Sequence, residues 1–489
     1  MKKILSLILI SSVVIFSSCD KKLTEIEPEY FINTRGDIKS LEDCNKLLNG
    51  AYKAMINISY YGGNMLMTDM MSGDAIKGNT TYLDAMELVD WAYNPTSAIT
   101  SKTWMTAYNV VAHTNMVIES VNKVPNSNDQ LKRKVLGQAY ALRGMVFFDI
   151  LRLYGEDYGR NSEKLGIVAR TEVDINSIKR STVKDSYTQI LNDLTKAQEE
   201  LKDLSLNVGN NNFIDEWGTK ALMARVYLYA GMYKEAYDHA SMVIMNPKFK
   251  LETPTNFLKV WRDDVYGGEV ILGLRVNMVD NIRVSTFITD YDGAYKYVAK
   301  RNYFDPSIIL TRNYDKVKDV RYGAYFSDTV RVGTPTSAKT NRALLTKYSG
   351  RGGTWNNIQD IKVIRLAEMF LIRAEAATYE ASLGEGLALK DLNAIRSARI
   401  SDYVSQTLSG EALKEAIRLE RRKEFPFEAQ IWFDLRRGKI NIDRDPTIFK
   451  SNKATNLKLS ADSYLRAWPI PFAEVANTEG VPVLQNDQY

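Results

Sequence analysis

The densest group of ionisable side chains in the sequence is a charged run near its C-terminal end, EAIRLERRKEFPFEAQIWFDLRRGK, residues 415–439. Five arginines in this run could form an anion site: Arg418, Arg421, Arg422, Arg436 and Arg437. Acidic residues alternate with them at helical spacing: Glu420, Glu424, Glu428 and Asp434. Because side chains three and four positions apart meet on a helix, we interpret the run as structural ion pairs that neutralise one another.

Residue types that carry catalysis are scarce elsewhere. The chain has two histidines, His113 and His239, and both fall in segments with helical periodicity. It has no glycine-rich phosphate loop, no GxSxG elbow, no HExxH motif and no paired cysteine ligands. Carboxylate pairs such as Asp69 and Asp74 carry no distinguishing signal. We therefore expect no enzymatic activity, no metal and no cofactor.

Helices are the elements that must position these groups. Residues 41–55 place Leu41, Cys44, Leu48 and Met55 on one apolar stripe, so Cys44 is expected to be a buried apolar residue. Residues 219–247 nearly follow the spacing of small and large residues in a tetratricopeptide-type helical hairpin. Residues 364–399, interrupted by glycines, predict a second hairpin.

Two stretches break the helical pattern. Residues 57–95 contain short clusters of Gly, Asn and Asp with scattered aromatics, and residues 255–360 contain tyrosine-rich polar loops. Within the second stretch, GGEVILGLRV (267–276) predicts a short strand. The sequence thus predicts a mainly α protein, with helical hairpins on one side and a loop-rich half with short strands.

The overall charge excludes one class of partner. The 489 residues contain 64 Lys and Arg against 59 Asp and Glu, a formal net charge of +5. This balance is too even to predict nucleic-acid binding. Aromatic residues make up 10% of the chain, which suits either tyrosine-rich packing or a binding surface.

The N-terminus has the form of an export signal. Residues 1–18 join Lys2 and Lys3 to a short apolar stretch, and the small residues Ser17 and Ser18 precede Cys19. The sequence Phe16-Ser17-Ser18-Cys19 resembles a bacterial lipobox, in which the cysteine is acylated and becomes the first residue. We expect lipidation at Cys19, followed by a tether and extended segment over 19–40. The alternative is an ordinary signal peptide that ends near a cysteine.

Four stretches together resemble one family. ERRKEFPFEAQIWFDLRRGK (420–439) resembles the ERR-x-E-L-x-FEG-x-R-x-x-DL-R signature of the SusD/RagB family, with departures at Phe425, Ala429 and Ile431. YALRGMVFFDILRLYGEDYG (140–159) and AWPIPFAEVANTEGVPVLQNDQY (467–489) are similar to two other family motifs. The lipobox followed by LTEIEP agrees with the family's mature start.

The resemblance implies one large α-rich domain, with an N-terminal region over 41–250 and a C-terminal region over 251–489. It also implies a non-catalytic lipoprotein on the cell-surface side of the outer membrane. Such proteins bind oligosaccharide or polysaccharide, or peptides in some branches, and act as a lid over a SusC-like TonB-dependent transporter. The family motifs are structural, so they do not fix the ligand site.

The expected ligand is a glycan, which needs exposed aromatic planes beside hydrogen-bonding groups. Family members often use aromatics from the two loop regions. The first region offers Tyr60, Tyr61, Tyr82, Trp91 and Tyr93 with Asn79 and Asn94, and the second offers Tyr291, Tyr295 and Trp355 among Asp292, Gly293, Arg351 and Asn356. We select Tyr82, Trp91, Asn94, Tyr291, Tyr295 and Trp355 as candidate ligand-binding residues.

Two other functions remain open from the sequence. A peptide-capturing protein of the RagB kind has the same fold and the same transporter partner, and it would recognise an extended backbone. A tetratricopeptide-type assembly factor would bind a protein partner and have no loop aromatic cluster. The identity of the glycan or peptide is not encoded in any motif.

Overall fold

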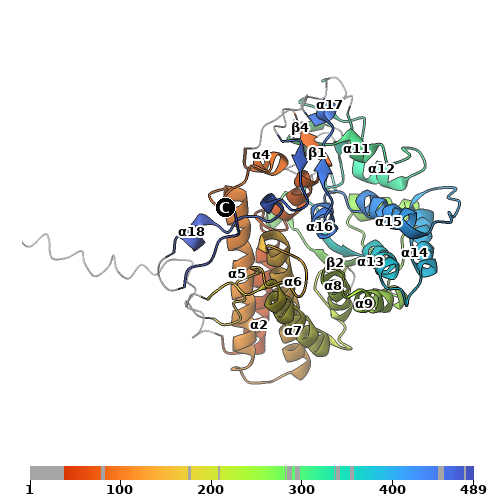
Figure 1. Cartoon of the computed structure of the whole chain (residues 1–489). Helices are drawn as coiled ribbons and strands as arrows, with labels where there is room; N and C mark the ends of the chain where they lie inside the picture. Colours follow the sequence, from red (N-terminus) through yellow and green to blue (C-terminus); the bar gives the residue numbers. More distant parts are fainter. Residues whose placement is uncertain are drawn as a thin grey trace, which may run out of the picture.

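The structure is a computed structural model (Figure 1). It describes residues 38–78, 83–173, 178–206, 210–280, 282–283, 289–291, 298–334, 336–337, 342–352, 357–449, 456–477 and 481–489.

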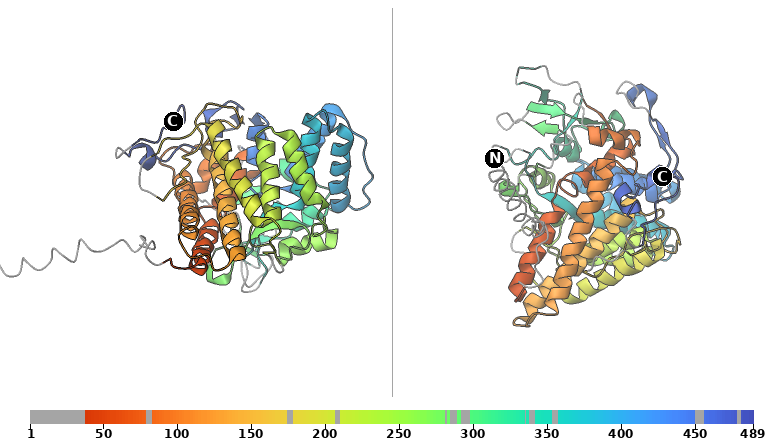
Figure 2. Two further views of the ribbon diagram at one scale, coloured as in Figure 1. Left: turned by 90° about the horizontal axis from the view of Figure 1, so that it is seen from below. Right: turned by 90° about the vertical axis from the view of Figure 1, so that its left-hand side faces the viewer.

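Nine long helices stand side by side in one row in the described part of the chain (Figures 1 and 2). They are α2 (Leu41–Met55), α5 (Ala98–Val121), α6 (Asp129–Tyr154), α7 (Val183–Leu201), α8 (Glu216–Tyr229), α9 (Tyr233–Met245), α13 (Leu366–Tyr379), α14 (Glu385–Arg399) and α15 (Gly410–Glu424). Each packs against the next, and α13 joins the row through α9.

Local sequence explains where these helices begin and how closely they pack. Ser40 caps α2 and Asp215 caps α8, each by accepting a hydrogen bond from a backbone N–H of the first turn. In α6, a Cβ on Gly137 would lie 2.5 Å from Leu201 of α7. The missing side chain therefore allows α6 and α7 to approach closely.

The α8–α9 pair confirms the first predicted hairpin, and α13–α14 confirms the second. Gly231 lies in the turn between α8 and α9 with a φ of +70°, and Gly384 precedes α14 with a φ of +79°. Glycine adopts this left-handed conformation without strain. Ala236 and Ala240 of α9 are fully buried, as expected for a close helix contact.

The rest of the described chain is built from short elements. The strands are β1 (Ala75–Lys77), β2 (Val270–Leu274), β3 (Thr289–Tyr291), β4 (Val298–Asn302), β5 (Phe304–Pro306), β6 (Phe326–Ser327), β7 (Arg331–Val332), β8 (Leu344–Leu345), β9 (Ile361–Arg365), β10 (Ile442–Asp443) and β11 (Lys458–Leu459). They form the antiparallel pairs β1–β5, β2–β9, β6–β8 and β10–β11, and a three-stranded sheet of order β3-β4-β7 in which β4 and β7 are parallel. β2 confirms the short strand predicted in GGEVILGLRV.

Short helices connect these strands. They are α3 (Asn64–Met67), α4 (Leu83–Asp90), α10 (Pro254–Arg262), α11 (Ile308–Thr311), α12 (Val320–Tyr325), α16 (Ile431–Arg437), α17 (Pro446–Phe449) and α18 (Phe472–Val475), with 3₁₀ turns η2 (Thr68–Ser72), η3 (Met278–Asp280) and η6 (Tyr464–Arg466). The predicted fold class, mainly α with hairpins on one side and short strands elsewhere, is confirmed. The proposed boundaries at residues 18, 40 and 250 stay predictions.

The core is one large apolar cluster, with a smaller cluster under α13–α15. Cys44 is fully buried, as expected, and burial raises the pKa of its thiol to about 11. Within the described residues, no helix is both long enough and apolar enough to cross a bilayer.

A group of buried charges joins the helices to the short strands; we call it the Glu424 cluster. Glu424 of α15 contacts Arg365 at 2.8 Å, Arg321 at 3.1 Å and Arg399 at 3.1 Å. Glu269 also pairs with Arg399, at 2.7 Å. These side chains are at most 1% exposed. Burial would raise the pKa of Glu424, but the three arginines outweigh it and hold that pKa far below its usual range.

Candidate functional site

Several predicted site residues lie outside the described residues: Cys19, Asn79, Tyr82, Asp292, Gly293, Tyr295, Trp355 and Asn356. Tyr291 is at the end of β3, where its backbone pairs with Ala299 of β4. Asn94 is exposed, and its side-chain oxygen accepts hydrogen bonds from the backbone and hydroxyl of Thr96. The structure therefore leaves the loop candidates as predictions, with the exceptions given next.

The prediction that Trp91 is an exposed ligand-binding residue is wrong. Its indole is 2% exposed, donates from Nε1 to the Met71 carbonyl at 3.0 Å, and has the Arg444 guanidinium 3.7 Å from its ring centre. A residue in this position does not offer a free face to a sugar. The loop composition suggested exposure, but Arg444, which packs on the ring, comes from a segment more than 300 residues away in the sequence.

Other loop tyrosines are also in the core. Tyr60 and Tyr61 both donate their hydroxyls to Asp149, at 2.6 and 2.7 Å, and Tyr93 donates to the Leu465 carbonyl. All three rings are at most 4% exposed. Their role is structural, which corrects the sequence-based expectation.

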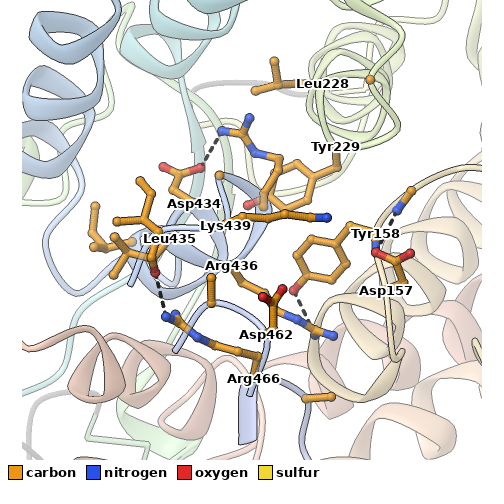
Figure 3. A pocket seen from close by; sticks show the side chains of 18 of the residues that line it. Asp157, Tyr158, Leu228, Tyr229, Asp434, Leu435, Arg436, Lys439, Asp462 and Arg466 are labelled. Carbon is orange, nitrogen blue, oxygen red and sulfur yellow. Dashed lines mark hydrogen bonds and ion pairs between the residues drawn. The ribbon is translucent and has the colours of Figure 1, made fainter. Parts of the chain in front are cut away.

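A large cavity lies between the row of helices and the C-terminal segments, and we call it the Arg436 cavity (Figure 3). Its volume is about 920 Å³. It is lined by the α8–α9 turn, the end of α13, one face of α15, most of α16 and residues from the segments 156–159, 461–467 and 486–488. This volume is in the range of small-molecule sites.

Part of the cavity wall is an ion-pair network. Arg421 contacts Asp434 at 2.8 Å, and Arg437 contacts both Asp434, at 3.0 Å, and Glu375. Burial would raise the pKa of Asp434, but Arg421 and Arg437 outweigh it and hold that pKa below its usual value. For these arginines the predicted structural ion pairs are confirmed.

The pairing partners of the other acidic residues differ from the prediction. Glu420 pairs with Arg321 and Arg396, while Glu428 pairs with Lys347 and Arg365. These partners come from distant segments and not from helical neighbours in the charged run. Helical spacing correctly predicted that the charges are paired, but it did not predict the partners.

Arg436 is the exception among the five arginines. It is 9% exposed, and its guanidinium donates to the carbonyls of Arg152, at 2.9 Å, and Gly155 while resting 4.3 Å from the centre of the Tyr158 ring. Among the described residues it has no carboxylate within ion-pair distance. For Arg436 the prediction of a structural ion pair is wrong.

A second buried arginine on this wall is also uncompensated. Arg466 is 3% exposed and donates to the carbonyls of Ser460, Ile440 and Leu459. Burial lowers the pKa of Arg466 to about 10, and the charge of Arg436 acts in the same direction. Arg436 and Arg466 thus concentrate positive charge on one inner wall.

Lys439 adds a third cation. It follows Gly438 at the end of α16, with an exposed side chain and a φ of +49°. Figure 3 shows its amine extending across the cavity between Tyr229 and Tyr158. Within the described part of the chain, no carboxylate pairs with it. A lysine in this left-handed conformation costs about 1 kcal/mol relative to glycine.

The acidic groups of the cavity are either satisfied or on the rim. Asp157 accepts hydrogen bonds from the backbone of Tyr158 and Gly159; burial would raise its pKa, but these hydrogen bonds hold it below the usual value. Asp462 and Asp487 are exposed, so solvent screens them. The inner wall is therefore more positive than the rim.

Tyrosine rings complete the cavity. Tyr158 and Tyr229 are buried in its wall, and burial raises the pKa of both hydroxyls. Tyr233 and Tyr379 stack on each other, with ring centres 4.8 Å apart and planes 13° apart, and Tyr379 is 47% exposed. Aromatic faces beside hydrogen-bond donors suit a polar ring such as a sugar.

The two histidines of the chain lie away from this cavity. His113 and His239 each contact the backbone carbonyl four residues earlier in their own helix, and both lie outside the cavity lining. In the described ranges, no group of three or more His, Cys, Asp or Glu side chains is placed to hold a metal.

Comparison with protein families matches both halves of the chain. A model described as "Starch-binding associating with outer membrane" matches residues 25–228, and a model described as "SusD family" matches residues 284–489. The curated SusD-like protein P2 from Formosa agariphila is 24% identical over 454 residues, covering 85% of this chain and 86% of that protein.

Solved structures share the fold over nearly the whole chain. A SusD superfamily protein from Bacteroides thetaiotaomicron is 26% identical with a TM-score of 0.78, covering 91% of this chain and 99% of that one. A structure named surface glycan-binding protein A, from Bacteroides fluxus, has 19% identity and a TM-score of 0.74, covering 92% of this chain and 100% of that one. With both halves matched and the fold shared, this chain belongs to the SusD/RagB family.

Proposed function

We propose that the protein is a cell-surface lipoprotein that binds oligosaccharide or polysaccharide and delivers it to a SusC-like TonB-dependent transporter in the outer membrane. The observation that carries this proposal is the match of both halves of the chain to the family, one model of which is described as starch-binding. The name of the Bacteroides fluxus relative agrees with a glycan ligand. The protein binds its ligand and does not transform it.

The proposed anchor is an acyl group on Cys19. Its support is the order of a charged start, an apolar stretch and small residues before the cysteine in residues 1–19. Two or more acyl chains hold a protein stably at a membrane, so Cys19→Ala should release it into the soluble fraction. A processed Cys19→Ala protein that stayed on the membrane would contradict lipid anchoring.

The proposed glycan surface uses the remaining loop aromatics. Tyr82, Tyr291, Tyr295 and Trp355 are its candidate stacking residues, with Asn94 as an exposed hydrogen-bonding neighbour. Trp91 is excluded because its ring is buried. Their residue types, in polar stretches of the sequence, support the proposal.

Affinity electrophoresis tests the binding function. The chain from residue 19 onward, carrying Cys19→Ala, is run through gels that contain one polysaccharide each, and at least one polymer should retard it. Trp355→Ala and Tyr291→Ala should each weaken retention about tenfold, which corresponds to about 1.4 kcal/mol. Phe472→Ala is the matched control, because Phe472 is a 60% exposed aromatic on α18.

Two results would count against the proposal. If no polysaccharide is retained and a peptide library binds instead, the RagB-like peptide-capturing function is favoured. If affinity purification of the lipidated protein from its own outer membrane yields no TonB-dependent transporter, the delivery step is contradicted.

A further inference from the structure

We propose that the Arg436 cavity is a second carbohydrate site, separate from the loop aromatics, that takes an acidic sugar. The chemical class is a hexuronate, a sugar ring that carries a carboxylate. The carboxylate would face Arg436 and Lys439, and the ring would lie among the tyrosines. This inference rests on the proposed function only in taking the ligand to be a carbohydrate.

The first support is the charge of the inner wall. Arg436 and Arg466 are 9% and 3% exposed, and carbonyl oxygens, which are dipoles, are the partners of their guanidinium groups. Buried charges are normally paired with an opposite charge. Two uncompensated cations on one cavity wall therefore favour an incoming anion.

The second support is that the carboxylates lining the cavity are already paired or hydrogen-bonded, or are exposed to solvent. Asp434 and Glu375 are already neutralised by Arg421 and Arg437, and Asp157 is satisfied by backbone N–H groups. The carboxylates without such partners, Asp462 and Asp487, are exposed. An anion that enters past the rim would meet cations that no protein carboxylate has neutralised.

The third support is the backbone of Lys439. Its φ of +49° is a conformation that glycine adopts more readily, yet a lysine occupies it. This conformation sends the amine across the cavity, as Figure 3 shows. Strained backbone conformations are common at binding sites, where they place a side chain in contact with the ligand.

Size and aromatic content favour a sugar over an extended peptide. A volume of about 920 Å³ accommodates one or two sugar rings. The stacked pair Tyr233 and Tyr379, of which Tyr379 is 47% exposed, offers ring faces for C–H groups. An extended peptide would need a strand edge or a similar row of free backbone groups, whereas helices and their turns form most of this wall.

The test uses the chain from residue 19 onward with Cys19→Ala. D-glucuronate, D-galacturonate, D-mannuronate and L-guluronate are titrated by calorimetry, each beside its neutral parent hexose. At least one hexuronate should bind at least tenfold more tightly than its neutral parent, and added NaCl should weaken it. Lys439→Gly should weaken that binding about fivefold without lowering the melting temperature, because glycine suits φ +49°.

Lys46→Ala is the matched control, because Lys46 is an exposed lysine on α2, which is not part of the cavity lining. It should leave hexuronate binding unchanged, as should Tyr291→Ala in the loop region. The inference is overturned if no hexuronate binds at millimolar concentration, if Lys439→Gly binds as well as Lys46→Ala, or if acidic peptides compete and hexuronates do not. None of these results affects retention of a neutral polysaccharide in gels, so failure here is distinct from failure of the proposed function.

Discussion

Two groups of buried arginines, the Glu424 cluster and the wall of the Arg436 cavity, differ in what surrounds their charge. In the Glu424 cluster, Arg321, Arg365 and Arg399 each contact a carboxylate, and these carboxylates raise the pKa of each guanidinium although burial opposes them. On the cavity wall, Arg436 and Arg466 contact carbonyl oxygens. In the Glu424 cluster the arginines stabilise the fold through ion pairs, whereas on the cavity wall their charge is available to a ligand.

Exposure alone does not identify a functional arginine. Arg399 and Arg466 are 0% and 3% exposed. What separates them is the presence of a protein counter-ion, because a paired charge has little left to offer a ligand. A search for buried cations without a carboxylate partner among the described residues therefore passes over the cluster. It finds Arg436 and Arg466 on the cavity wall, and it also finds Arg180 and Arg444, which do not line the cavity.

The largest expected effect breaks the Glu424 cluster. Glu424→Gln should destabilise the protein by about 3–5 kcal/mol, because it leaves buried arginines without their shared carboxylate. Urea unfolding at neutral pH measures it. The control is Glu415→Gln on the same helix, whose pair with Arg418 is exposed and should contribute at most about 1 kcal/mol. Equal effects from the two variants would remove the distinction between the regions.

A smaller effect concerns Asp69, a buried carboxylate without a cation among the described residues. It is 1% exposed and accepts a hydrogen bond from the Trp432 backbone at 3.2 Å, and burial raises its pKa from 3.8 to about 7. The folded state therefore holds a proton that the unfolded state releases between about pH 4 and 7. Stability from this site is full below pH 4 and is lost as the pH rises to 7.

Asp69→Asn removes this titration. At about 1.4 kcal/mol per pKa unit, the variant should gain up to about 4 kcal/mol relative to the parent between pH 4 and pH 8. Urea unfolding of both proteins across this range measures the gain. A difference between them that stays constant with pH would contradict the assignment.

The smallest effect is expected on the cavity wall. Arg436→Met keeps an apolar stem against Tyr158 and loses the hydrogen bonds to the Arg152 and Gly155 carbonyls, so it should cost about 1–2 kcal/mol of stability. Arg399→Met in the Glu424 cluster is the comparison and should cost more, because it removes the closest cation of buried Glu269 and one of the three cations that contact Glu424. If Arg436→Met lowers stability more than Arg399→Met does, Arg436 contributes more to the stability of the fold than Arg399.

Much of the helical half was predictable because its signals are local. The apolar stripe of residues 41–55 matches α2, and the glycines at 231 and 384 lie beside the turns of the two predicted hairpins. In these segments, each residue's burial follows from neighbours three or four positions away. The periodicity of apolar residues in the sequence therefore indicates which face of the helix is buried.

The site was less predictable because its contacts are distant. Trp91 is in a segment with loop composition, and its burial depends on Arg444. Arg436 is in a run whose spacing predicts ion pairs, and only the folded structure shows that its partners are carbonyls at the C-terminal end of α6. The five arginines of this run could form an anion site, but the helical spacing of the acidic residues among them favours ion pairs.

The link between the end of α6 and the last residues also bears on the order of folding. Arg436 contacts the Arg152 carbonyl across 284 residues, and Asn486 donates to the Tyr154 carbonyl across 332. Because closing a long loop costs more entropy than closing a short one, we expect contacts between residues so far apart in sequence to form after local hairpins such as α8–α9. The Arg436 cavity is then among the last parts of the molecule to assemble, and a chain that has not yet docked its C-terminal segments has a helical scaffold but no second site.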